Sequence, residues 1–332
     1  MNIYGYDINK KGLHQGDVKI PEAMGVVAGG VFLAILSIFR IYFNLQDLAN
    51  EVNKVQFFSS SFAIGFALVL GYIDDFKNLS WRFKILLPTL PGLCLLMTYT
   101  GGTTIIIPKI LQSTFNINPL IDLGWMYKIF IFLITIFCFN SINILAGING
   151  LEVGQSIIIT LAIITHNLIQ ITNGITLHAH ISSLCMMQPF LATSFGLLIF
   201  NWYPASIFIG DTYTYFAGTT LAVAGIHGHL SKTMFFFFMP QILNFVYSLP
   251  QLFKIVPCPR HRLPQFNKKS GLLIGSNDMN LVNLVLRWHG PWSERNLCKF
   301  ILSFQVLCCI LTLVVSNAKS YNLHNLIKFS RE

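Results

Sequence analysis

Two adjacent carboxylates, Asp74 and Asp75, stand at the end of an apolar run in the segment GYIDDFKNLSWRFK. Asn78 and the cations Arg82 and Lys84 follow in the same segment. Because acids at a membrane boundary are costly to desolvate, they usually mark a functional site. Paired carboxylates beside cations suit a divalent metal or the handling of a phosphate. The alternative is a solvated loop between two membrane helices, and this segment alone fits both.

Three asparagines, Asn140, Asn143 and Asn149, lie in a second segment, FNSINILAGINGLEVGQ. Asparagine oxygens can ligate hard metals, and carboxamides can read the edge of a nucleobase. Neighbouring glycines allow the backbone to approach a ligand closely. The same residues would also serve a glycine-capped helix C-terminus, so this motif by itself is weakly specific.

Asp211 lies in a third segment, NWYPASIFIGDTYTY, just before a long apolar run. It could cap a helix N-terminus. It could instead supply the anionic oxygen that a divalent cation needs beside neutral amide oxygens. Phe208, three residues earlier, could offer its ring face to a base or could face lipid.

A fourth segment, PCPRHRLP, places Arg260, His261 and Arg262 between prolines. Proline stiffens the loop, and two guanidinium groups in a stiff loop favour a clamp for a diphosphate. The alternative is positive anchoring beyond a membrane helix, which lysines without so many prolines would serve as well.

The composition predicts a polytopic, all-α membrane protein. The chain is 54% hydrophobic and only 11% charged, and it holds many apolar runs of the length that a membrane helix requires. Positive loops that face anionic lipid or an anionic substrate explain the net charge of +9 better than nucleic acid does. We therefore expect no nucleic-acid partner.

We predict one membrane domain over 1–332, with a cytosolic N-terminal segment at 1–22 and a cytosolic substrate loop at 257–296. The segment 101–108 is too short to span a bilayer and is predicted as a short strand or an interfacial piece. About nine membrane helices are predicted, at 23–43, 57–73, 85–100, 126–144, 156–173, 181–200, 212–230, 233–256 and 297–316.

Fourteen of the 22 Lys and Arg residues fall on the side of the membrane that holds 1–22 and 257–296. The positive-inside rule places this side in the cytosol. All four chemistry-bearing segments fall on the same side. Two histidine pairs fall on the other side without acids nearby, where loop polarity explains them better than metal binding: His178 with His180, and His227 with His229.

Four long segments, in the same order, resemble the polyprenyl-phosphate sugar-1-phosphate transferases of glycosyltransferase family 4. They are GYIDDFKNLSWRFKILLPT, FNSINILAGINGLEVGQS, NWYPASIFIGDTYTYFAG and GHLSKTMFFFFMPQILNFVYSLPQLFKIVPCPRHRLP. PEAMGVVAGGVFL, at 21–33, also resembles the family's first cytosolic loop and following helix. The resemblance runs from about Asp7 to Ser316 and is to the eukaryotic branch, which transfers GlcNAc-1-phosphate from UDP-GlcNAc to dolichyl phosphate.

The resemblance implies a role for each candidate residue. Asn143 and Asp211 match a magnesium-binding pair. Asn149 matches the residue that reads uracil, Phe208 the ring that stacks on it, and Glu22 a carboxylate near the uridine. The remaining candidates match a catalytic acidic loop (Asp74, Asp75, Asn78 and Lys84) and a loop that holds the diphosphate and the amino sugar (Arg260, His261 and Arg262).

The resemblance also implies a reaction and a setting. We expect a Mg²⁺-dependent transferase that uses UDP-GlcNAc and dolichyl phosphate, contacts membrane lipid and releases UMP. An Asp74 or Asp75 carboxylate could deprotonate the lipid phosphate or orient it with Lys84. The implied location is the endoplasmic reticulum membrane, with the active site facing the cytosol, and a homodimer is left open.

Family members have ten membrane helices, so the predicted set lacks the first. Either the sequence is truncated or the chain is a compact version with nine helices. Two alternatives to the expected enzyme remain. One is a sister enzyme that uses another UDP-sugar or polyprenyl phosphate. The other is a non-catalytic relative that binds or transports lipid.

Overall fold

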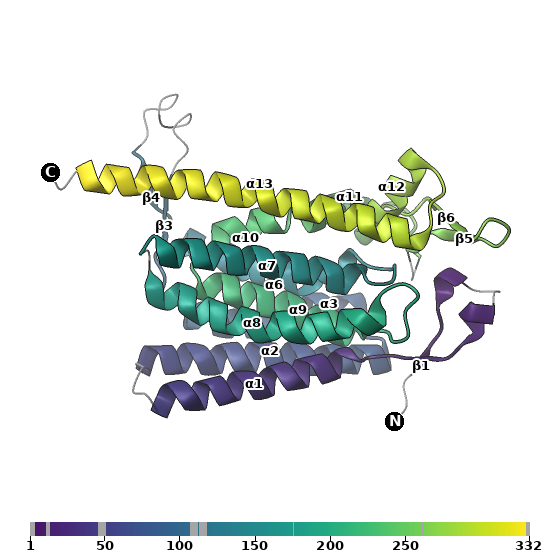
Figure 1. The fold of residues 1–332 in the computed structure, drawn as a ribbon, viewed down its shortest axis with the longest axis horizontal. Coiled ribbons are helices and arrows are strands. Elements are labelled where there is room, and N and C mark those ends of the chain that lie inside the picture. Colours follow the sequence, from purple (N-terminus) through teal and green to yellow (C-terminus); the bar gives the residue numbers. More distant parts are fainter. Residues whose placement is uncertain are drawn as a thin grey trace.

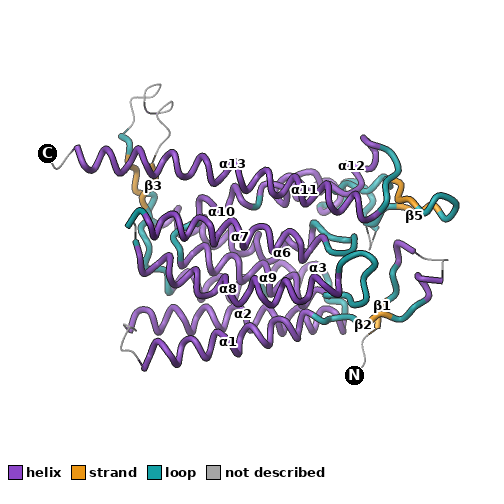
Figure 2. Tube along the Cα trace, in the orientation of Figure 1, coloured by secondary structure: helices purple, strands orange, loops and turns teal. Residues whose placement is uncertain are grey.

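The computed structural model describes residues 4–10, 14–45, 51–106, 112, 118–174, 176–259 and 262–329. Long helices lie side by side along one axis (Figure 1). Short strands and loops gather at the two ends of this bundle (Figure 2).

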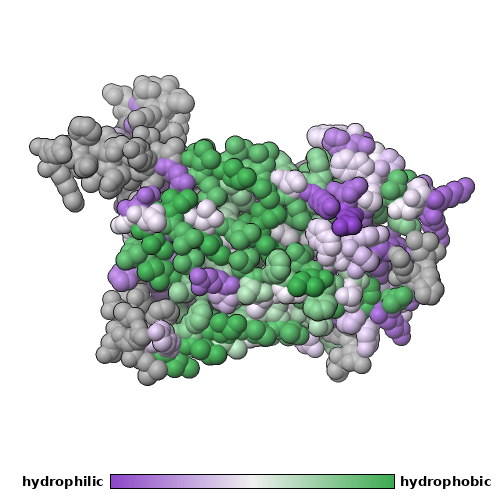
Figure 3. Space-filling model, in the orientation of Figure 1, coloured by the Kyte–Doolittle hydropathy of each residue, from purple (hydrophilic) through white to green (hydrophobic). Residues whose placement is uncertain are grey.

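Among the residues that the structure describes, six helices are long and apolar enough to cross a membrane. They are α1 (Gly25–Leu45), α2 (Glu51–Lys77), α6 (Trp125–Ile144), α7 (Leu151–Thr172), α8 (Leu177–Asn201) and α13 (Glu294–Phe329). Apolar side chains cover the middle of the bundle, and hydrophilic ones gather at one end (Figure 3). The predicted class, a polytopic helical membrane protein, is confirmed.

The predicted span 212–230 corresponds to α9 (Gly210–His227), which packs mainly against α2 and α6 and is buried along nearly its whole length. Glycines permit this close packing. A Cβ on Gly218 would lie 2.1 Å from the carbonyl oxygen of Cys138, and a Cβ on Gly71 would lie 2.5 Å from Thr212 Cα. Because protein rather than lipid surrounds α9, its threonines and glycines are tolerated at membrane depth.

The prediction of unbroken helices at 85–100 and 233–256 is wrong, because each region holds two helices. Proline explains both breaks, since it lacks an N–H donor and collides with the preceding turn. Pro88 precedes the second helix of the first pair, and Pro240 lies in the first turn of the second helix of the other. The pairs are α3 (Trp81–Leu86) with α4 (Thr89–Met97), and α10 (Ser231–Phe237) with α11 (Met239–Leu252).

Small elements that were not predicted occupy the hydrophilic end. The N-terminal segment pairs β1 (Tyr4–Gly5) with β2 (Ile20–Pro21), and two short 3₁₀ helices, Ile8–Lys10 and His14–Asp17, lie between them. The segment 257–296 contains the hairpin of β5 (Gln265–Asn267) and β6 (Leu272–Ile274), followed by α12 (Leu281–His289). An apolar cluster that includes Leu151, Leu273, Leu286 and Leu297 packs β6 and α12 onto α7 and α13.

At the opposite end, β3 (Thr104–Ile106) pairs with β4 (Leu120–Asp122) in an antiparallel ladder. Thr104 lies opposite Asp122. Residues 107 and 108 lie outside the described residues, and within 101–106 the short strand is the observed alternative.

Candidate active site

Lys84 lies between two carboxylates that come from different helices. Its Nζ is 2.8 Å from Oδ2 of Asp74, near the end of α2, and 3.1 Å from Oδ2 of Asp211, in the first turn of α9. Burial opposes the charge on this ammonium, but the charges of Asp211 and Asp74 outweigh burial and raise the pKa of Lys84. Lys84 is therefore a fixed cation that links α2 and α9.

Both oxygens of Asp74 accept hydrogen bonds. The Leu79 N–H donates to Oδ1 at 2.9 Å, and the Tyr215 hydroxyl donates to Oδ2 at 2.6 Å. Asp74 is only 1% exposed. Tyr215 was not among the predicted site residues, because nothing in the sequence pairs it with an acid so far away in the chain. This carboxylate therefore holds Lys84 in place.

Asp75, although adjacent to Asp74, has a different set of partners. It accepts hydrogen bonds from the backbone N–H groups of Asp211 at 2.6 Å and Thr212 at 3.0 Å, and from the Thr212 hydroxyl. Acidic groups stabilise the free N–H groups at a helix N-terminus, and here the cap for α9 comes from α2. Gly210, with φ +70°, leaves room for this cap, since a Cβ there would lie 2.1 Å from Asp75 Oδ2.

Asn143, in the last turn of α6, reaches the other oxygen of Asp211. Its Nδ2 donates to Asp211 Oδ1 at 2.8 Å. Turning the carboxamide over would present its oxygen to the same space. The predicted pair Asn143 and Asp211 is therefore brought together.

Two adjoining cavities share Asn143 and Gly147 in their walls. They have volumes of about 220 Å³ and about 610 Å³, and we call them the smaller and the larger cavity. Among the predicted residues, the smaller cavity is lined by Asn143, Asn149, Phe208 and Asp211. The larger cavity is lined by Asn78, Lys84, Asn143 and Arg262.

The loop that carries Asn149 is held by three acids that sequence reasoning missed. The Asn149 N–H donates to Glu294 Oε1 at 2.7 Å, and its side-chain Nδ2 donates to Asp7 Oδ2 at 3.2 Å. Gly147 N–H donates to Glu152 Oε1 at 3.0 Å. Buried acids that bind backbone N–H groups of a loop fix its conformation. Glu294 and Asp7 left no local signal, because they lie far from the loop in the sequence, whereas Glu152 stands within the segment FNSINILAGINGLEVGQ itself.

Glu22 lies beside Phe208. A Cβ on Gly5 would be 3.0 Å from Glu22 Oε2 and 3.1 Å from Phe208 Cδ2, so both side chains flank the same glycine. Burial, and next the charge of Asp75, raise the pKa of Glu22. In the described part of the chain, Glu22 is not among the residues that line either cavity, so its place is beside the predicted stacking ring.

Of the predicted diphosphate loop, Arg260 and His261 lie outside the described residues. Arg262 lines the larger cavity, and its backbone oxygen accepts a hydrogen bond from Asn280 Nδ2 at 2.6 Å. Burial lowers the pKa of Arg262, and its Nη1 has no hydrogen-bond partner among the described residues. An anionic acceptor would remove the cost of that unpaired donor.

Fold and site together define a polytopic membrane protein with a cation-linked acidic site where two cavities meet, at the hydrophilic end of the bundle. The model of the family described as "Glycosyl transferase family 4" matches residues 57–229. The chain belongs to this family.

Three curated proteins that are similar to this chain are named as transferases. A Dictyostelium discoideum protein named UDP-N-acetylglucosamine–dolichyl-phosphate N-acetylglucosaminephosphotransferase is 43% identical over 326 residues, covering 92% of this chain and 80% of the relative. A Saccharomyces cerevisiae protein of the same name is 34% identical, covering 96% and 85%. A Borreliella burgdorferi phospho-N-acetylmuramoyl-pentapeptide-transferase is 30% identical, covering 62% of each chain.

Proposed function

We propose that this chain transfers GlcNAc-1-phosphate from UDP-GlcNAc to dolichyl phosphate and releases UMP. The names of the eukaryotic relatives supply the reaction. For this chain, the proposed reaction is supported by the positions of Lys84 and Asp211. Lys84 lines the larger cavity, Asp211 lines the smaller one, and the two side chains are 3.1 Å apart.

The smaller cavity would hold the uridine end of the donor. Asn149 would read the uracil edge, and Phe208 would stack on its face. The larger cavity would hold the two phosphates that react, because it contains the ammonium of Lys84 and the guanidinium of Arg262. Each cation would neutralise phosphate charge where it develops, which is the electrostatic part of catalysis.

In this reaction an oxygen of the lipid phosphate attacks the sugar-proximal phosphorus. A new P–O bond forms, and the P–O bond to UMP breaks. The second pKa of a phosphate monoester is about 6, so at neutral pH the attacking oxygen needs no protein base. We therefore assign both acids a positioning role, with Asp74 holding Lys84 and Asp75 holding the first turn of α9.

Magnesium fits the donor set. Mg²⁺ is commonly held by one or two carboxylates together with substrate phosphates. The Asp211 carboxylate, in the wall of the smaller cavity, and the Asn143 carboxamide, in the walls of both cavities, supply hard oxygens. When bound, the ion would neutralise charge on the diphosphate. In the described part of the chain, no group of three His, Cys, Asp or Glu side chains could hold a metal. This agrees with a site that substrate completes.

The proposed setting is the endoplasmic reticulum membrane, with both cavities opening to the cytosol. Support comes from the excess of Lys and Arg on the side that carries the site, which the positive-inside rule assigns to the cytosol.

A substrate panel tests the proposed specificity. Purified protein would be given UDP-GlcNAc, UDP-GalNAc or UDP-glucose, each with dolichyl phosphate or undecaprenyl phosphate. We expect the highest kcat/KM for UDP-GlcNAc with dolichyl phosphate. A clear preference for another pair would make the chain a sister enzyme, and lipid binding without turnover of any pair would make it a non-catalytic relative.

A further inference from the structure

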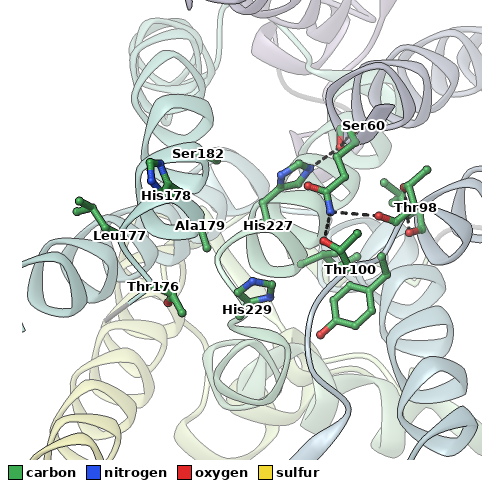
Figure 4. Close-up of a pocket in the computed structure, with 14 residues that line it drawn as sticks. Ser60, Thr98, Thr100, Thr176, Leu177, His178, Ala179, Ser182, His227 and His229 are labelled. Carbon is green, nitrogen blue, oxygen red and sulfur yellow. Dashed lines mark hydrogen bonds between the residues drawn. The ribbon is translucent and has the colours of Figure 1, made fainter. Parts of the chain in front are cut away.

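A third cavity, of about 340 Å³, lies at the end of the bundle opposite the candidate active site. Figure 4 shows the side chains that line it. We call it the distal cavity. α9 joins the two ends, with Asp211 in its first turn and His227 as its last residue. At 1.5 Å of rise per residue, these residues are roughly 25 Å apart along the helix. The distal cavity is therefore separate from the proposed site of phosphate transfer.

Hydrogen-bonding side chains from several elements form one wall of the distal cavity. Gln56 Nε2 donates to the Thr98 backbone oxygen at 3.1 Å and to Thr100 Oγ1 at 2.7 Å. Ser60 Oγ lies 2.6 Å from His227 Nε2. Figure 4 shows His227 between Ser60 and the space that His229 also borders. This wall is rigid, because its polar groups already hold one another.

A second wall brings an aromatic ring and an imidazole together. A Cβ on Gly101 would lie 2.3 Å from the Tyr99 hydroxyl oxygen and 2.6 Å from His229 Nδ1, so both polar atoms converge on this glycine. The two ring centroids are 6.3 Å apart, and both residues line the cavity. Two exposed residues at the start of α8, Thr176 and His178, also line the cavity.

The charge of the lining excludes ions as the main ligand. Among the described residues that line the distal cavity, none is Asp, Glu, Lys or Arg. A metal is disfavoured as well, because no three His, Cys, Asp or Glu side chains of the described residues form a metal-holding group. The polar groups that remain are hydroxyl, carboxamide and imidazole groups. The apolar lining is Leu95, Leu177, Ala179 and Ile226.

We propose that the distal cavity is a binding site for a neutral, hydroxyl-rich ring, that is, a sugar. Each sugar hydroxyl both donates and accepts a hydrogen bond, as do the Ser, Thr and Tyr hydroxyls and the Gln carboxamide of this lining. The C–H face of a sugar packs on aromatic rings, which Tyr99 and His229 supply. A volume of about 340 Å³ falls in the range of small-ligand sites. Free sugars and the head groups of glycolipids share this chemistry.

Binding can be measured on the whole chain in phosphatidylcholine nanodiscs, free of glycoside detergent. The soluble probe is methyl β-D-glucoside, followed by saturation-transfer NMR, and the lipid probe is glucosyl diacylglycerol added to the nanodiscs, followed by thermal unfolding. We expect saturable binding of at least one probe, and the arm that responds identifies the source. Gln56→Leu and His229→Leu should each weaken binding about tenfold, which is what one lost hydrogen bond is worth.

Two controls separate this site from the rest of the molecule. His289→Leu changes an exposed histidine on α12 and should leave binding unchanged. Asp211→Asn alters only the other end of α9 and should also leave binding unchanged. The proposal is overturned if neither probe binds saturably, if the two cavity variants bind as well as wild type, or if Asp211→Asn abolishes binding. None of these outcomes depends on the transferase activity.

Discussion

At the scale of single residues, the proposed reaction depends on a cation held between two acids. Lys84 contacts Asp74 on α2 and Asp211 on α9, and Asn143 contacts the second oxygen of Asp211. One oxygen of Asp211 thus contacts the ammonium of Lys84, and the other accepts a hydrogen bond from the Asn143 amide. Removing its charge should disturb both the cation and any metal held there.

We expect Asp211→Asn to lower kcat about 100-fold or more, the usual cost of removing a group that stabilises a transition state. The protein should stay folded, because the Asn side chain can still accept from Asn143. Steady-state kinetics over a range of Mg²⁺ concentrations and thermal unfolding measure the two effects. Asp122→Asn, an exposed acid at the far end, is the matched control. Wild-type turnover of Asp211→Asn at limiting Mg²⁺ would refute the metal assignment.

Replacing Arg262 with lysine tests whether binding of the diphosphate needs the planar guanidinium group, which lysine lacks. Arg262→Lys should keep protein abundance but lower kcat/KM for UDP-GlcNAc roughly ten- to a hundredfold, the loss of one charge-assisted contact worth about 1.5–3 kcal/mol. Arg295→Lys, an exposed arginine at the start of α13, should have no effect. If both variants match wild type, Arg262 serves only as a positive anchor.

At the scale of elements, α2 and α9 form one unit at the site. The side chain of Asp75 caps α9, and Gly71 allows the two helices to touch near Thr212. Because Asp211 occupies the first turn of α9, whatever moves that turn moves the candidate metal ligand. The position of α9 is therefore part of the geometry of the proposed active site.

Gly210→Ala should damage this unit. Alanine disfavours φ +70°, and its Cβ would lie 2.1 Å from Asp75 Oδ2, so the cap must shift. We expect kcat to fall at least tenfold in the folded, monodisperse fraction isolated by gel filtration. In the control Gly196→Ala on α8, the added Cβ would have no neighbouring atom within 4 Å, so this variant should be as stable as wild type or slightly more stable. Equal activity of the two variants would show that the cap does not position Asp211.

At the scale of the whole molecule, the orientation across the bilayer can be tested with the free cysteines. Cys258, in the loop before Arg262, is exposed, whereas the other six cysteines are buried or half-buried. In sealed microsomes, whose cytosolic face is outside, a membrane-impermeant maleimide should therefore label Cys258. Cys258→Ser should abolish the labelling. Labelling that needs permeabilised membranes would place the site in the lumen.

Glycosylation gives an independent check of the same orientation. Asn78-Leu79-Ser80 is the only Asn-x-Ser/Thr acceptor sequence in the chain, and it lies beside the larger cavity. Because N-glycans are added in the lumen, Asn78 should remain unmodified. A glycosidase-sensitive mass shift that disappears in Asn78→Gln would reverse the predicted orientation.

Much of this architecture follows from local sequence. Each predicted span falls on a helix or on a helix broken near proline, because bilayer-length apolar runs are a local property. The convergence of Asn143 with Asp211 was expected only from the family resemblance. The different partners of Asp74 and Asp75 could not be predicted, since their adjacency in the sequence does not reveal which groups each side chain contacts. Tyr215 and Glu294 were missed for the same reason, as their partners are distant in the chain.

The transfer of phosphate together with the sugar is the central claim, and one measurement tests it directly. Purified protein in lipid nanodiscs would receive dolichyl phosphate, Mg²⁺ and UDP-GlcNAc labelled at the sugar-proximal phosphorus. We predict that the label enters the lipid fraction, that UMP is released in equal amount, and that Asp211→Asn suppresses both. Release of UDP with an unlabelled glycolipid, or of labelled GlcNAc-1-phosphate into water, would contradict the proposed function.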